Sequence, residues 1–180
     1  MNKKNKETSK YLSYILRHHP ESIGLSLDKE GWAVISDLIL LSTKESYNID
    51  NDLLRSIVDN SDKKRFMISE DGLRIRASQG HSSQKVSIQY SKKTPPKNLY
   101  HGTAVRFISL IKEQGLIPKK RQYVHLTENK DTAYEVGQRY GKPIILRIKT
   151  MEMYQQGFNF YQAENGVWLT DSVPFKFIQE

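Results

Sequence analysis

The sequence contains no cysteine and no long apolar stretch. The lack of cysteine excludes a disulfide framework, a thiolate nucleophile and a cysteine-ligated zinc ribbon. No apolar run approaches the roughly 20 residues that span a bilayer, and the basic start "MNKKNKETSK" lacks the apolar core of a secretory signal. The five histidines show no HExxH or similar ligand spacing. We therefore expect a cytoplasmic protein with no membrane partner and no catalytic metal, whose chemistry comes from arginine, histidine and a bound organic cofactor.

The chain is rich in positive charge and has enough apolar residues to form a core. Its 180 residues, 37% of them hydrophobic, are enough for one ordinary domain or two small ones. The chain has 28 Lys and Arg residues against 20 Asp and Glu, which gives a formal charge of +8. This balance favours a polyanionic partner, either nucleic acid or a phosphorylated ligand.

Residues 1–82 show helical patterns followed by a hairpin pattern. Apolar spacing in "KYLSYILRHHP" predicts a helix that stops before Pro20, and two further helices are expected in "GWAVISDLILLSTK" and "NIDNDLLRSIVDNSD". The expected N-caps are Ser36 or Asp37 for the second helix and Asp50 or Asn51 for the third. Two alternating runs joined at Asp71-Gly72 predict a β-hairpin. This order of elements favours a winged helix-turn-helix lobe.

The composition changes in residues 83–97, and a mixed pattern follows over residues 98–180. The stretch "SSQKVSIQYSKKTPPKN" is polar and basic and ends in two prolines, which favours an extended linker. Beyond it, strand-like "LYHGT", "YVHLT", "PIILRIKT", "FNFYQAENGVWLT" and "VPFKFI" alternate with two helical stretches, "VRFISLIKEQ" and "KDTAYEVGQRYG". The fold class that we predict is therefore α+β, with a mixed second lobe. There is no internal repeat, GxGxxG or Walker loop.

Six pieces of the sequence, in order, resemble one known family. They are "LSYILRHHP", "IRASQGHS", "LYHGT", "RQYVHLTEN", "AYEVGQRYGKPIIL" and "NGVWLTDSVP". Together they resemble the RNA 2'-phosphotransferases, enzymes that use NAD to remove a splice-junction 2'-phosphate, over about residues 11–177. The resemblance implies an N-terminal winged-helix lobe, a C-terminal ADP-ribosyltransferase-like lobe and an active site in the cleft between them.

The resemblance also implies a catalytic set that binds the 2'-phosphate. This set is Arg17, His18, Arg76 and Arg139. Planar guanidinium groups suit such a dianion because they form paired, charge-assisted hydrogen bonds with its oxygens. Taken one by one, these residues would more simply be helix-end or strand-surface residues, and only the family pattern reverses that interpretation.

The segment "IRASQGHS" receives a further interpretation from the same resemblance. Arg76 would point toward the phosphate, Gly80 would let the chain turn, and His81 would secure this junction or help with the phosphate. Arg74 lies two residues before Arg76, so it shares the same strand face and is a predicted RNA contact. His81 is a second predicted RNA-side residue.

The second lobe is implied to bind NAD. The residues assigned to the dinucleotide are His101, Gly102, Thr103, Arg121, His125 and Val167. The glycine would let the dinucleotide approach the backbone, and Arg121 would pair with its pyrophosphate. Val167 stands where protein-modifying ADP-ribosyltransferases often have Glu, a departure that suits an acceptor that is already an anionic phosphate.

The implied reaction has two steps and consumes NAD as a co-substrate. The RNA 2'-phosphate attacks the ribose carbon that bears nicotinamide, giving ADP-ribosylated RNA. The ribose 2''-hydroxyl then attacks the phosphorus and releases 2'-OH RNA and ADP-ribose 1'',2''-cyclic phosphate. We expect a monomer whose partners are 2'-phosphorylated RNA and NAD.

Three other functions stay open from the sequence. The chain could be an ADP-ribosyltransferase that caps terminal phosphates of nucleic acid, which would use the same residues. It could be a non-catalytic winged-helix regulator that binds nucleic acid. A protein-modifying ADP-ribosyltransferase is disfavoured by Val167.

Overall fold

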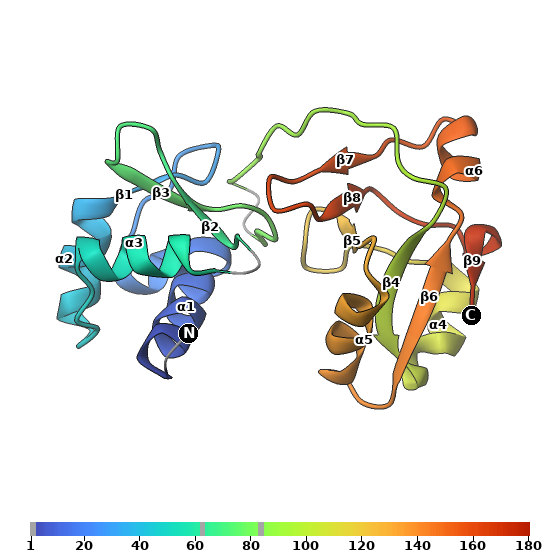
Figure 1. Ribbon diagram of the computed structural model, residues 1–180, viewed down its shortest axis with the longest axis horizontal. Helices are drawn as coiled ribbons and strands as arrows, with labels where there is room; N and C mark the ends of the chain where they lie inside the picture. Colours follow the sequence, from blue (N-terminus) through green and yellow to red (C-terminus); the bar gives the residue numbers. More distant parts are fainter. Residues whose placement is uncertain (1–2, 62–63, 83–84) are drawn as a thin grey trace. The chain divides into compact units, whose positions relative to one another are not determined.

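The computed structural model describes residues 3–61, 64–82 and 85–180. The chain divides into two compact units, residues 1–89 and 90–180, and each has its own hydrophobic core. Both units combine helices with small antiparallel sheets, which confirms the predicted α+β class (Figure 1). In the part of the chain that the structure describes, no helix has the length and apolar character needed to cross a membrane.

The first unit packs three helices against one three-stranded sheet. Its helices are α1 (Lys3–Arg17), α2 (Ile35–Lys44) and α3 (Asn51–Asp59), with a short 3-10 helix at Pro20–Ile23. Its strands are β1 (Ala33–Val34), β2 (Phe66–Ile68) and β3 (Arg74–Ala77), in the order β1-β3-β2. Fully buried side chains from α1, α2, α3 and both longer strands form the core, among them Leu12, Leu38, Leu54, Phe66 and Ile75.

The predicted hairpin is confirmed. Ile68 of β2 lies opposite Ile75 of β3, and the N–H of Ser69 donates to the carbonyl of Arg74. Gly72 has a φ of 73°, which a side chain would disfavour, so the Asp-Gly pair makes the turn as expected. β1 pairs with the other edge of β3 and completes the sheet.

Two of the three helix boundaries follow the sequence, and one does not. α1 ends at Arg17, before Pro20, and the side chain of Asp50 caps α3 by accepting from the N–H of Leu53. The predicted cap of α2 was wrong, because that helix begins one residue before Ser36. The N–H of Ile35 donates to the carbonyl of Leu73 in the hairpin, so the sheet satisfies the helix start and no side-chain cap is formed.

The second unit contains two sheets and three α-helices. One sheet has the order β4-β6-β9, with β4 (Leu99–Ala104), β6 (Pro143–Ile148) and β9 (Ile178–Gln179); the other has the order β5-β8-β7, with β5 (Val124–Leu126), β8 (Trp168–Thr170) and β7 (Tyr161–Gln162). The helices are α4 (Ile108–Gln114), α5 (Lys130–Gln138) and α6 (Thr150–Gln155), and 3-10 turns precede α4 and β9. Paired hydrogen bonds between Tyr100 and Thr127 join the sheets.

α6 and the C-terminal turn differ from the sequence prediction. The sequence pattern predicts no helix after β6 and favours a strand in "VPFKFI". The structure has a 3-10 turn at Phe175–Phe177 and only two strand residues after it. Phe177 and Met153 of α6 are both buried in the core of this unit, so packing selects helical turns where local pattern favoured extended chain.

The described residues of the predicted linker pack against both units in turn. Val86 and Ile88 are buried, and the N–H of Ser87 donates to the carbonyl of Lys29 in the first unit. Lys92 and Lys93 instead pair with the chain around β7 in the second. Residues 83 and 84 lie outside the described residues.

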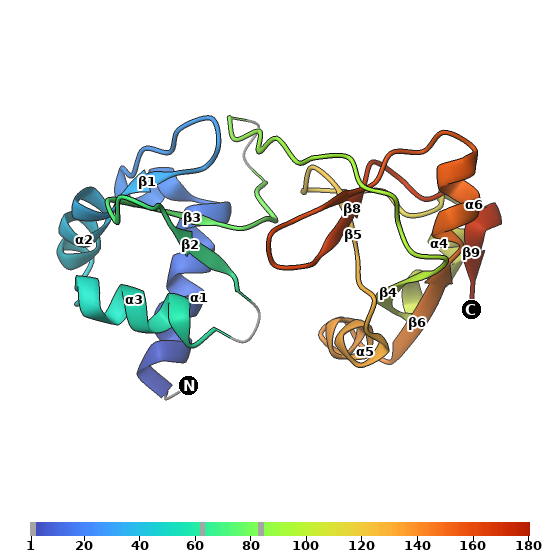
Figure 2. The ribbon, with the colours of Figure 1, turned by 45° about the horizontal axis from the view of Figure 1, so that its top comes forward.

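α5 lies very close to β4 and β6, as both ribbon views show (Figure 2). A Cβ atom on Gly102 would lie 1.6 Å from the carbonyl oxygen of Ala133 in α5. A Cβ on Gly137 of α5 would lie 2.6 Å from the carbonyl oxygen of Thr103. Two glycines, one on each element, therefore allow the helix and the strand to meet.

We expect Gly102→Ala to lower the free energy of unfolding by about 3 kcal/mol or more, because α5 must move away from β4. Gly166→Ala is the matched control: no described atom lies within 4 Å of its Cβ position, and only its φ of 80° is unfavourable. The control should lose about 1 kcal/mol. Urea unfolding followed by circular dichroism measures both, and equal losses would show that the close approach is not needed.

Candidate active site

The end of α1 is tied to the chain that follows β3. Arg17 is the last residue of α1, and its Nη2 donates to the carbonyl of Arg65 at 3.5 Å. The N–H of Ser82 donates to the carbonyl of Arg17, and the Ser82 hydroxyl lies 3.1 Å from Nδ1 of His18. Gly80 has a φ of 89° and lets the chain turn back beside Arg17. Residues 17 and 18 are thus positioned by a segment more than sixty residues away.

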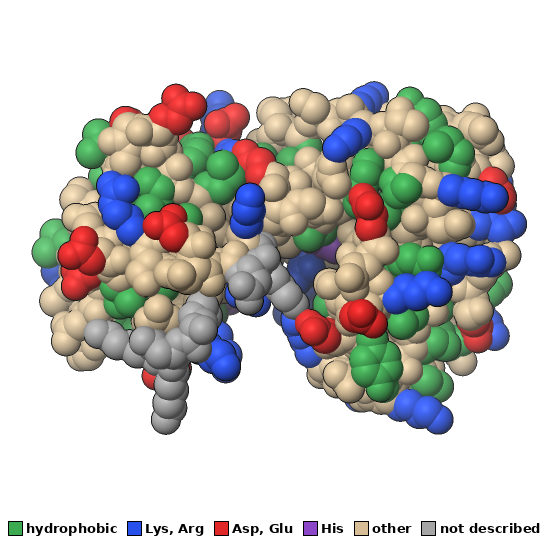
Figure 3. All heavy atoms as spheres, viewed as in Figure 1, with side chains coloured by type: hydrophobic (Ala, Val, Ile, Leu, Met, Phe, Trp, Pro, Cys, Tyr) green, Lys and Arg blue, Asp and Glu red, His purple; other side chains and the backbone are tan. Residues whose placement is uncertain are grey.

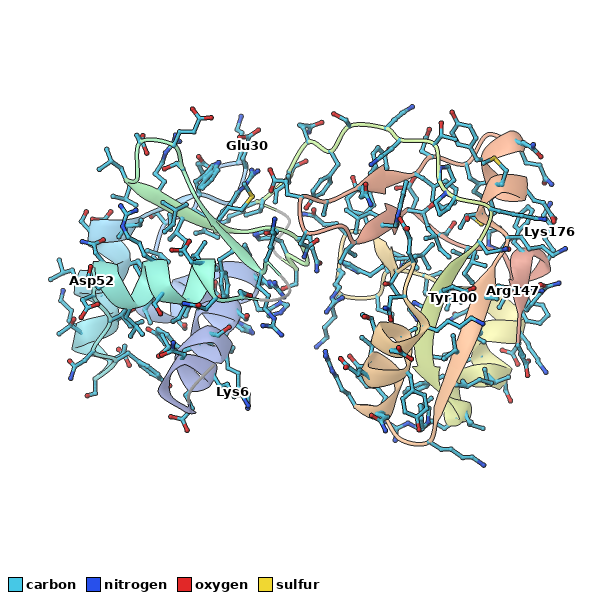
Figure 4. All side chains as sticks on the ribbon, viewed as in Figure 1. Lys6, Glu30, Asp52, Tyr100, Arg147 and Lys176 are labelled. Carbon is cyan, nitrogen blue, oxygen red and sulfur yellow. The ribbon has the colours of Figure 1, made fainter. Side chains whose placement is uncertain are left out.

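Arg76 lies on β3 with only 8% of its surface exposed. Its guanidinium carbon is 4.5 Å from the centre of the Trp32 ring, and Nη1 is 3.4 Å from the carbonyl oxygen of Glu30. Glu30, labelled in Figure 4, belongs to the loop before β1. A charged group this buried must be held by such contacts.

His81 lies among the basic residues of this unit. Burial of its ring, which is 2% exposed, and the charges of Arg17, His18 and Arg76 lower the pKa of His81 to about 4. His81 is therefore neutral at pH 7, and its Nε2 has no hydrogen-bond partner among the described residues. The charges that act on His81 show that the structure brings together three of the four predicted catalytic residues. We call Arg17, His18, Arg76 and His81 the basic cluster.

Arg74 lies at the outer edge of the same strand face. Its guanidinium is 5.6 Å from the Trp32 ring, so the prediction that Arg74 and Arg76 share a face is confirmed. It also lies 4.0 Å from a carboxylate oxygen of Asp28, an exposed pair that contributes little stability. Arg74 can reach a ligand from solvent, whereas the buried His81 offers little surface to RNA. His81 is thus buried, whereas Arg74 is exposed.

His101 on β4 is set up as a hydrogen-bond acceptor. Its Nδ1 lies 3.0 Å from the carbonyl oxygen of His125 and must donate to it, because a carbonyl cannot donate. Burial, the largest effect, lowers the pKa of His101, and the nearby charges of Arg121 and Lys119 lower it further. The neutral ring then keeps its lone pair on Nε2, where it can accept a hydrogen bond from a hydroxyl group.

Arg121 and His125 form the neighbouring part of this unit. Nη1 of Arg121 donates to Nδ1 of His125 at 3.2 Å, which places the remaining ring proton of a neutral His125 on Nε2. Crowding by protein atoms lowers the pKa of the Arg121 guanidinium, although the residue as a whole is exposed. Tyr140 opposes this shift and Arg139 adds to it, so Arg139, the exposed C-cap of α5, lies near Arg121. We call His101, Arg121, His125 and Arg139 the second-unit cluster.

The other three predicted dinucleotide residues have structural contacts of their own. Gly102 faces α5, and close packing against the carbonyl of Ala133 by itself requires the missing side chain. Thr103 is 7% exposed. Val167 is half-buried in the turn before β8, where its carbonyl accepts from the N–H of Ala163.

Three residues of the site were missed from the sequence. Trp32 contacts both arginines of β3, Ser82 contacts His18, and Tyr140 acts on Arg121. Ser82 is the last residue of "IRASQGHS" and Tyr140 follows Arg139 directly, so proximity to a motif residue was their signal. Trp32 had none, because only the pairing of β1 with β3 brings it to Arg76.

No group of three or more potential metal-ligating side chains occurs within residues 3–61, 64–82 and 85–180. Figure 3 shows Lys and Arg side chains spread over the visible face of the second unit, with Asp and Glu side chains among them.

Comparison with known proteins identifies one family. The sequence model of a family described as RNA 2'-phosphotransferase, Tpt1 / KptA family, matches residues 3–172. The chain is 67% identical over 180 residues to a protein of Pectobacterium atrosepticum named probable RNA 2'-phosphotransferase, covering 100% of both chains. A protein of the same name from Pseudomonas aeruginosa is 54% identical over 174 residues, which is 97% of this chain and 96% of the relative.

The lowered pKa of His81 predicts a pH-dependent stability. The unfolded chain binds this proton near pH 6.5 and the folded chain only near pH 4, so stability should rise between pH 4 and 6.5 and then level off. The full contribution is about 3 kcal/mol. His81→Asn should remove this part of the pH dependence, measured by urea unfolding at several pH values. Ser61→Ala, which changes another buried polar residue without removing a titratable group, should keep it; an unchanged pH profile in His81→Asn would contradict the assignment.

Proposed function

Because this chain belongs to the RNA 2'-phosphotransferase family, we propose that it removes an internal 2'-phosphate from RNA in an NAD-dependent reaction. The observation that carries the proposal is the basic cluster, in which the charges of Arg17, His18 and Arg76 all act on the buried ring of His81. A 2'-phosphate is a compact dianion, and converging guanidinium groups are well suited to bind it.

The proposed chemistry needs one co-substrate. NAD supplies a ribose carbon that bonds to the RNA 2'-phosphate as nicotinamide leaves, which gives ADP-ribosylated RNA. The 2''-hydroxyl of that ribose then bonds to the phosphorus, and the bond from phosphorus to the RNA 2'-oxygen breaks. The products are 2'-OH RNA and ADP-ribose 1'',2''-cyclic phosphate.

In this proposal the basic cluster binds the phosphate. Arg17 and Arg76 would hold its oxygens and stabilise the charge that builds up in the second step. His18, which contacts Ser82, would orient the phosphate or take part in proton transfer to the leaving oxygen. His81 stays neutral at pH 7 and adds no charge of its own to the group.

The second-unit cluster would bind NAD. Nε2 of His101 is suited to accept a hydrogen bond from a ribose hydroxyl, since its Nδ1 is already engaged. Arg121 would pair with the pyrophosphate, and the half-buried Val167 provides no carboxylate, as suits an anionic acceptor. Arg139 would reach the phosphate from this unit.

The two folds that we propose agree with these roles. The first unit has three helices and a β2–β3 hairpin, the elements of a winged helix-turn-helix, and Arg74 would contact RNA phosphates. The second, with its two small antiparallel sheets and interposed helices, would be an ADP-ribosyltransferase-like lobe.

The function is tested by incubating the protein with NAD and a 2'-phosphorylated oligonucleotide and identifying the products by mass spectrometry. We expect nicotinamide, the 2'-OH oligonucleotide and ADP-ribose cyclic phosphate, all absent when NAD is omitted. A 5'-phosphorylated oligonucleotide of the same sequence is the control. Phosphate loss without NAD would contradict the proposal, and stable ADP-ribosylation of the 5'-phosphate alone would favour the capping reaction.

We expect loss of Arg139 to slow the second step more than the first. The transition state of the second step carries more charge on a crowded phosphorus, so it should be more sensitive to the loss of one guanidinium. Arg139→Ala should therefore accumulate ADP-ribosylated RNA, visible as a slower band in a gel time course. Slow substrate loss without that band would assign Arg139 to binding or to the first step.

A further inference from the structure

A tight turn around Asp28 precedes the strand β1. Oδ1 of Asp28 accepts hydrogen bonds from the N–H groups of Glu30 and Trp32, both at 2.9 Å. The N–H of Asp28 donates to the carbonyl of Trp32, and Gly31 has the positive φ of 82° that the turn requires. An aspartate that binds the backbone in this way fixes a short turn. The backbone of Trp32 is therefore held on both sides.

His81 of the basic cluster and the chain that follows it pack against the same turn. A Cβ on Gly31 would lie 2.9 Å from Nε2 of His81 and 3.2 Å from Cγ1 of Val86, so both side chains pack directly on its backbone. The N–H of Ser87 also donates to the carbonyl of Lys29. Its backbone is thus fixed by its own hydrogen bonds and by packing.

The turn presents two groups to Arg76. The Trp32 ring lies against the guanidinium, with 4.5 Å between the guanidinium carbon and the ring centre, and the Glu30 carbonyl is 3.4 Å from Nη1. An aromatic face restricts a planar guanidinium in a way that it cannot restrict a lysine ammonium. The N–H donors of a stacked guanidinium point outward in its plane, where they can meet phosphate oxygens.

Building on the proposed function, we propose that Trp32 is a positioning residue: it fixes the plane of Arg76 so that the guanidinium binds the RNA 2'-phosphate. Trp32 acts through Arg76 and does not itself touch the reacting atoms. Arg74, farther from the ring and exposed, contacts the RNA backbone without reading the 2'-phosphate.

The proposal predicts that loss of the Trp32 ring weakens binding of the 2'-phosphate and leaves binding of the rest of the RNA unchanged. Trp32→Leu removes the flat ring but keeps an apolar side chain, so Arg76 should leave its plane. The preference of the protein for a 2'-phosphorylated over a 2'-OH oligonucleotide should fall about tenfold. Trp32→Phe keeps an aromatic face and should retain most of the preference. Arg74→Gln should weaken binding of both oligonucleotides alike.

A double-mutant cycle separates positioning from general stability. The dissociation constants of both oligonucleotides are measured by calorimetry for the parent, Trp32→Leu, Arg76→Ala and the double variant, with thermal unfolding of each. If Trp32 acts through Arg76, the double variant should show the same preference as Arg76→Ala alone. Independent effects that add, or equal weakening of both oligonucleotides by Trp32→Leu, would overturn the proposal.

Arg76→Lys is a second variant that tests the proposal if Trp32→Leu does not fold. It leaves Trp32 in place and keeps the positive charge at residue 76, but it removes the planar guanidinium that contacts the ring. It should lose the preference nearly as far as Arg76→Ala, and full retention would overturn the proposal. A parent that does not prefer the 2'-phosphate would also overturn it. A parent that shows the preference but yields no products with NAD would contradict the proposed function alone, because the binding ratios still decide the role of Trp32.

Discussion

The first unit depends on an imidazole that stays uncharged among basic side chains. His81 fills the buried space beside Gly31, and a charge there would add to those of Arg17 and Arg76. Its neutrality lets the unit concentrate positive charge near the end of α1 and on β3 without burying another cation. The aromatic ring of Trp32 contacts the Arg76 guanidinium and stabilises it without a negatively charged partner.

In the second unit, polar side chains lie near the point where helix α5 packs against strand β4. Gly102 and Gly137 bring α5 against β4, and Arg139 follows at the end of that helix. The carbonyl of His125 fixes the tautomer of His101, so one backbone hydrogen bond decides which ring nitrogen can accept from a ligand. Packing thus positions α5, and one hydrogen bond orients the His101 ring.

The sequence predicted the features that depend on residues close together in the chain. It missed the features that depend on pairing between distant segments. The Asp71-Gly72 turn and the Asp50 cap are local, and both are confirmed. The α2 start was wrong because the hairpin, far along the chain, supplies its hydrogen bond. The predicted catalytic residues came from the family resemblance, and no local pattern separates them from surface arginines. Trp32 had no signal at all, since only β1–β3 pairing brings it to Arg76.

His81 is a buried, neutral residue on which the charges of Arg17, His18 and Arg76 act. An NMR titration of the His81 ring nitrogens in the folded protein, assigned with His81→Asn, measures its protonation directly. We expect the ring to stay neutral from pH 7 down to pH 5 and to titrate with a pKa of about 4. A ring that titrates near 6.5 or above would show that neither burial nor the charges of Arg17, His18 and Arg76 keep His81 neutral.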